Sequence, residues 1–107
     1  HGLANAVLLP IVLEDYGAAA YPRLARLAHL VGIQEASAEA SARAFIAEIR
    51  AMNARMGIPD HFDCIRSEDI PLMASWACRE ANPVYPVPVI YDQARFARVI
   101  ERSCVKP

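Results

Sequence analysis

The sequence predicts an all-α protein, an orthogonal bundle of about five helices. Its 107 residues include 20 alanines but only 4 glycines and no threonine, a mixture that favours helix over sheet. Apolar residues recur every three or four positions in several stretches, which is the spacing of one helix face. The length is that of one small domain, so we expect residues 1–107 to form a single domain.

The first predicted helix covers residues 2–13 and is apolar almost all the way round. Such a pattern predicts burial on every face, which the rest of the chain and an upstream segment would together supply. Pro10 removes one backbone donor and is expected to kink this helix. A second helix is predicted over 22–31, with Pro22 in its first turn and Gly32 at its end. We expect His29 to lie in solvent and the buried face to consist of Leu24, Leu27, Ala28 and Val31.

Residues 37–56 are predicted to form the longest helix, with Ser37 as its N-cap and Gly57 as its stop. Glu39 and Arg43 stand four residues apart, in the order that favours an ion pair along a helix. The core stripe of this helix is expected to contain four residues at helical spacing, Phe45, Ile49, Met52 and Met56.

After a loop over 57–66, Ser67 can cap a fourth helix that runs through Glu80, with Pro71 in its first turn. Three prolines within residues 82–88 predict an extended strap, because helix cannot continue through them. A last helix is predicted over 91–103. The inward-facing residues of these two helices are expected to be Leu72, Met73, Trp76, Phe96, Val99 and Ile100.

Charge and cysteine usage exclude several classes of protein. The net charge is −1, from 11 basic and 12 acidic residues, with no basic stripe for nucleic acid and no polybasic run for a membrane. The longest apolar run, residues 3–13, is shorter than the roughly 20 residues needed to cross a bilayer. Cys64, Cys78 and Cys104 are widely spaced and odd in number, so neither a disulfide framework nor a zinc knuckle is predicted. This usage fits a reducing cytoplasm, with neither nucleic acid nor membrane as a partner.

The residues alone offer little catalytic chemistry. The sequence has no glycine-rich phosphate loop and no GxSxG elbow, and its three histidines never stand at HxxH or HxxxH spacing. Asp60 and His61 place a carboxylate beside an imidazole. Adjacent loop residues usually point apart, so we interpret this pair as polar loop surface.

The opening string HGLANAVLLP, residues 1–10, resembles a signature of the iron-containing alcohol dehydrogenases, a branch of the dehydroquinate-synthase-like superfamily. The resemblance runs from His1 to about Arg102 and implies the C-terminal helical domain of that fold. Further similar stretches follow in order along the chain: RLA at 23–25 and 26–28, MGIP at 56–59, EDIP at 68–71 and NP at 82–83.

The resemblance implies an enzyme of two parts, in which an N-terminal α/β domain binds NAD or NADP and precedes the helical domain. In that family one aspartate and three histidines hold a divalent metal, and the last histidine begins the motif that His1 begins here. His1 is therefore the expected ligand of Fe²⁺ or Zn²⁺, both of which an imidazole suits. The other three ligands and the nucleotide-binding domain are expected upstream of His1.

The implied reaction is hydride transfer between nicotinamide and a metal-bound alcohol or carbonyl, as in an alcohol dehydrogenase or aldehyde reductase. The expected partners are a small alcohol or aldehyde and further copies of the enzyme, in a homodimer or larger assembly. The 107 residues by themselves are expected to be inactive. Cys78 has two interpretations: a wall of the substrate pocket, as the resemblance allows, or an ordinary buried thiol.

Two alternatives remain open at the level of sequence. The chain can be a non-catalytic helical interaction module, which would be stable without upstream sequence. It can also belong to another enzyme of the superfamily, such as a maleylacetate reductase or a glycerol dehydrogenase, whose ligand set differs. Ile11 and Val84 depart from residues that are frequent in the family, which leaves the substrate open but does not affect the expected ligand.

Overall fold

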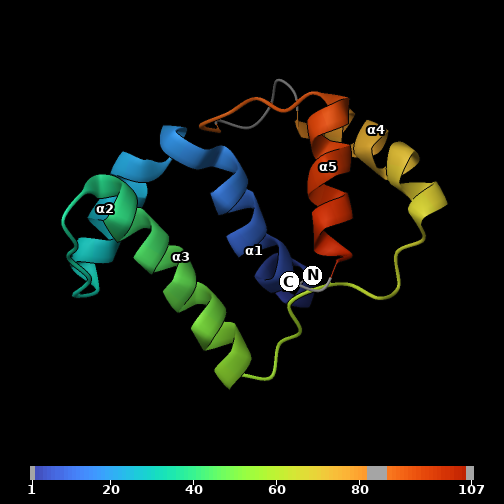
Figure 1. The fold of residues 1–107 in the computed structure, drawn as a ribbon. Coiled ribbons are helices and arrows are strands. Elements are labelled where there is room, and N and C mark those ends of the chain that lie inside the picture. Colours follow the sequence, from blue (N-terminus) through green and yellow to red (C-terminus); the bar gives the residue numbers. More distant parts are fainter. Residues whose placement is uncertain (1, 82–86, 106–107) are drawn as a thin grey trace. The chain divides into compact units, whose positions relative to one another are not determined.

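A computed structural model describes residues 2–81 and 87–105. These ranges contain five α-helices and two short 3-10 turns and no strand, which confirms the all-α class and the predicted number of helices. The chain divides into two compact units, His1–Pro59 and Asp60–Pro107, each with its own helices (Figure 1). Most of the predicted proline strap, residues 82–86, lies outside the described residues.

The first unit contains α1 (Gly2–Tyr16), a 3-10 turn (Gly17–Ala19), α2 (Tyr21–Leu30) and α3 (Ala38–Arg55). The helix α3 contacts both α2 and α1 (Figure 1). All three helices were expected from the sequence, and their observed bounds lie within three residues of the expected ones.

The ends of these helices follow the capping residues in the sequence. Gly32 (φ +85°) and Gly57 (φ +74°) lie just after α2 and α3 in the left-handed conformation, which glycine adopts without a steric cost. The Ser37 hydroxyl oxygen accepts a hydrogen bond from the backbone N–H of Ala40 at 3.1 Å, which confirms Ser37 as the N-cap of α3.

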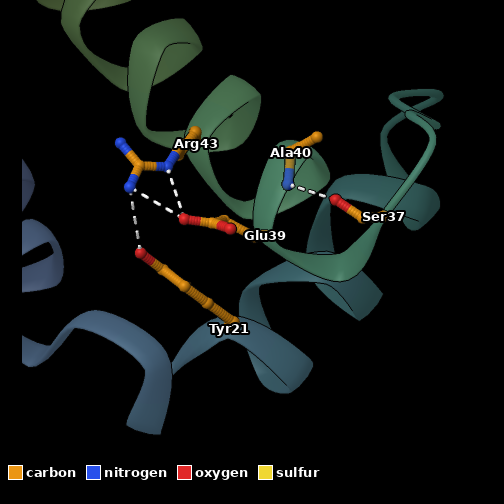
Figure 2. Close-up of polar contacts among 5 residues, drawn as sticks. All are labelled: Tyr21, Ser37, Glu39, Ala40 and Arg43. Carbon is orange, nitrogen blue, oxygen red and sulfur yellow. Dashed lines mark hydrogen bonds and ion pairs between the residues drawn. The ribbon is translucent and has the colours of Figure 1, made fainter.

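The predicted ion pair in the first turns of α3 is also confirmed. Arg43 Nη2 lies 2.9 Å from Glu39 Oε1 and donates a second hydrogen bond to the hydroxyl of Tyr21 at 3.4 Å (Figure 2). The cluster joins the start of α3 to the start of α2. Because its side chains are exposed, we expect it to contribute little to stability.

The core of the first unit is built largely on alanine. Ala20, Leu24, Ala42 and Ile46 form its buried cluster, and Ala28 on α2 is also fully buried. Partly buried residues pack against this cluster: Leu13, Tyr16, Tyr21 and Phe45. Small side chains at the contact allow α2 and α3 to approach closely, so larger residues beside the contact remain exposed.

Several residues predicted to be buried in the first unit are therefore exposed. On α2, Leu27 retains 47% of its surface, and Val31 lies beyond the last helical residue. Met52 on α3 and Met56, which directly follows α3, are exposed as well. The helix α3 has 18 residues and α2 only 10, so α2 covers only part of the length of α3.

The second unit pairs α4 (Ile70–Ala81) with α5 (Gln93–Ser103), and a 3-10 turn (Ser67–Asp69) leads into α4. The expected helix from 67 thus begins as a 3-10 turn, at which Ser67 is not the N-cap. Asp92 caps α5 by accepting a hydrogen bond from the N–H of Arg95 at 2.8 Å.

Two faces of α4 are apolar, and the buried one is not the one predicted from the sequence. The face that carries Ile70 and Ala74 is buried, whereas Leu72 and Trp76 are 52% and 54% exposed. Met73 is half-buried. On α5 the prediction was better, since Val99 is buried and Phe96 and Ile100 are half-buried.

Candidate functional site

The predicted metal ligand, His1, lies outside the described residues. It directly precedes Gly2, the first residue of α1, in the sequence. The contacts that hold α1 are therefore the described contacts nearest to His1 in the sequence.

The helix α1 is buried along only one of its sides. Val7, Pro10 and Ile11 are buried, but Leu3 and Leu9 are 57% and 47% exposed. Within this chain only one side of α1 is buried, so the expectation of burial on every face, which also relies on an upstream segment, stays a prediction. The even apolar pattern of α1 left no polar face from which the exposed side could be predicted.

Two polar contacts join α1 to α3. The side-chain amide Nδ2 of Asn53 donates a hydrogen bond to the backbone carbonyl of Ala6 at 2.9 Å. Further along α1, the guanidinium of Arg50 forms an ion pair with the carboxylate of Glu14. The contact of Asn53 was not predicted from the sequence. The only available signal was Pro10, which leaves a helix carbonyl in need of a donor without indicating which residue supplies one.

Cys78, the candidate for the substrate pocket, lies half-buried on α4. Its sulfur is 4.0 Å from the backbone carbonyl oxygen of Tyr91, at the start of the segment that leads into α5. Both residues belong to the second unit. The thiol thus has a weak polar contact within its own unit, and its role at a substrate pocket stays a prediction.

His61 forms a contact that sequence analysis did not expect. Its Nδ1 lies 2.7 Å from Asp60 Oδ1 and its Nε2 lies 3.0 Å from Asp63 Oδ1, so a carboxylate faces each ring nitrogen. The adjacent residues Asp60 and His61 therefore point toward each other and not apart. The hydrogen bond to Asp60 raises the pKa of His61, and the charge of Asp63 acts in the same direction. Only the protonated ring can donate to both carboxylates at once.

We expect the stability of the protein to depend on the charge of His61. Because its pKa is raised in the folded state, the contribution is complete below the unfolded value of about 6.5 and is lost as the pH rises through the folded pKa. The test is an NMR titration of His61 in the wild type, D60N and D63N, with thermal unfolding followed across the same pH range. Each substitution should lower the pKa of His61, and H61Q should remove this part of the pH dependence. An unchanged pKa in both variants would show that the carboxylates do not act on the ring.

The described residues do not complete a metal site among themselves. They contain no group of three or more His, Cys, Asp or Glu side chains placed to hold a metal ion. The imidazole of residue 1 has the donor chemistry for Fe²⁺ or Zn²⁺, but it supplies one ligand of a site that needs several. Among the described helices, none combines the length and apolar character needed to span a membrane.

Comparison with known proteins gives a consistent result. Residues 1–103 match the family model described as the C-terminal part of the Fe-containing alcohol dehydrogenase family. The chain is also similar to the lactaldehyde reductases of Escherichia coli K12 and Escherichia coli O157:H7, with 36% identity over 92 residues in each case. The matched region is 78% of this chain and 24% of either relative, so the chain spans about a quarter of their length.

Proposed function

Because this chain belongs to the iron-containing alcohol dehydrogenase family, we propose that it is the helical C-terminal part of a metal-dependent, NAD(P)-linked alcohol dehydrogenase or aldehyde reductase. The observation that carries the proposal is the family match over residues 1–103, which begins with the HGLANA string. Similarity to two lactaldehyde reductases supports a small alcohol or aldehyde as the substrate.

His1 is the metal ligand in this proposal. When bound, Fe²⁺ or Zn²⁺ would supply Lewis acidity to the oxygen of the substrate while hydride is exchanged with the nicotinamide. The neutral imidazole would contribute one lone pair to the ion. The remaining ligands and the nucleotide-binding domain lie upstream, and residues 1–107 alone are inactive.

The proposed function also includes a substrate pocket, a cellular compartment and an assembly state. Cys78 contributes to the wall of the substrate pocket, with its half-buried position on α4 as support. The enzyme acts in the cytoplasm as a homodimer or larger assembly, and neither nucleic acid nor a membrane takes part. Membership of the family favours this enzyme over a non-catalytic helical module.

Removal of the metal from the full-length enzyme tests this function. We expect the chelated enzyme to lose activity toward lactaldehyde with NADH or NADPH by about a hundredfold or more, since metal polarisation is worth several kcal/mol. Addition of Fe²⁺ or Zn²⁺ should restore the rate, and residues 1–107 alone should show no turnover with either ion. Full turnover by an enzyme shown to contain no metal would contradict the proposal.

A further inference from the structure

One carbonyl group of α1 has lost its helical partner. In an α-helix the N–H of each residue donates to the carbonyl four positions earlier, and Pro10 has no N–H to offer Ala6. The proline ring also crowds that carbonyl and pushes it away from the helix. The helix nevertheless continues from Gly2 to Tyr16 across this position.

The donor that meets this carbonyl comes from α3. Asn53 lies 47 residues later in the chain, and its side-chain amide donates to the oxygen of Ala6 at 2.9 Å in a partly buried setting. The carbonyl to which Asn53 donates is the one on α1 that lacks a backbone donor because of Pro10. The amide of Asn53 therefore takes the place of the backbone N–H that α1 lacks.

The bond lies between Pro10 and the N-terminal end of α1, at Ala6. A helix that lacks one of its own hydrogen bonds bends more easily at that point, so we call Pro10 the hinge, the position at which the two ends of α1 can most easily move relative to each other. The end before the hinge leads back to His1 and is held by Asn53, whereas the end after it carries Glu14 and is held by Arg50. Loss of the Asn53 bond would free only the end that precedes the hinge.

We propose that Asn53 is a positioning residue for the metal ligand His1. The inference rests on the proposed function, in which His1 binds the ion. Asn53 fixes the part of α1 around Ala6, which is the described helix from which the chain leads back to His1. Groups that orient a metal ligand in this way commonly contribute about 10- to 100-fold to the affinity for the metal.

The experiment measures the affinity of the full-length enzyme for Zn²⁺ by competition with a chromophoric chelator, and records the absorption spectrum of the Co²⁺-loaded enzyme. N53D keeps the size of the side chain but cannot donate to a carbonyl, and N53L removes both polar atoms. We expect each variant to bind Zn²⁺ about 10- to 100-fold more weakly and to change the Co²⁺ spectrum. The matched control is R50M, which removes the α1–α3 contact beyond the hinge and should leave both readouts unchanged.

A second substitution separates positioning from general damage to the fold. P10A returns a backbone N–H to α1, so Ala6 regains its helical donor and Asn53 is no longer needed. The double variant P10A/N53L should therefore bind Zn²⁺ within about threefold of P10A alone. If N53L is too unstable to purify, the comparison of P10A with the double variant still decides the question.

Three results would overturn the inference: wild-type affinity in N53D and N53L, equal losses in N53L and R50M, or no rescue by P10A. H1A distinguishes these from a failure of the proposed function. If H1A abolishes Zn²⁺ binding while the Asn53 variants bind normally, only the positioning role is wrong. If H1A itself binds normally, His1 is not a ligand and both proposals fail.

Discussion

Replacement of His1 by alanine in the full-length enzyme is expected to remove most of the bound metal and to lower kcat/KM by about a hundredfold or more. One ligand is lost, and the rate then lacks the several kcal/mol that metal polarisation of the substrate oxygen provides. Metal content by elemental analysis and the rate of lactaldehyde reduction are the two measurements. The binding of NADH or NADPH should be unaffected, because the proposed function assigns the nucleotide site to an upstream domain.

The chain offers a control of the same residue type for this prediction. His29 is exposed on α2, and H29A should keep the metal and the full rate. A loss of metal in both variants would indicate a general effect of removing an imidazole. Retained metal and normal turnover in H1A would remove His1 from the site.

The second large effect is expected in the core of the first unit. Leu24 is 4% exposed and packs with Ala20, Ala42 and Ile46, whereas Leu27 on the same helix is 47% exposed. Truncation of a buried leucine removes its packing and leaves a cavity, so L24A should lower the free energy of unfolding by about 2–5 kcal/mol. The same truncation at an exposed position should cost less than about 1 kcal/mol, as in L27A.

Hydrogen exchange of the amides in α2 and α3 measures this difference locally in the full-length enzyme. Protection in both helices should fall sharply in L24A and remain close to the wild-type value in L27A. Equal losses in the two variants would show that the face of α2 that carries Leu27 is as buried as the face that carries Leu24, contrary to the observed exposures.

The sequence was sufficient to predict the helices but not the faces that they bury. Local signals set the helix ends: Ser37 and Asp92 accept capping bonds, and Gly32 and Gly57 adopt the conformation that ends a helix. Burial depends on which helices meet, and here alanines occupy the contacts. Ala28, Ala42 and Ala74 are fully buried, while Leu27 beside Ala28, and Leu72 and Trp76 on either side of Ala74, are exposed. The prediction of buried residues favoured large apolar side chains at helical spacing. It was therefore wrong for several of them: Leu27, Met52, Leu72 and Trp76.

The candidate site was accessible to sequence analysis only through resemblance. A metal site is normally indicated by several ligands at fixed spacing, and this sequence offers a single proposed ligand, His1. Asn53 could not be predicted for a different reason. The open carbonyl at Ala6 follows from Pro10, but any donor that the fold brings near can fill it, and the partner lies 47 residues away.

The coordination of the metal by His1 is tested most directly by an anomalous-scattering map of the intact enzyme loaded with Zn²⁺. We expect the peak at about 2.0–2.1 Å from a ring nitrogen of His1, with the other protein ligands contributed by the upstream part of the chain. A fully occupied ion with a complete set of ligands at a distance from this ring would contradict the account.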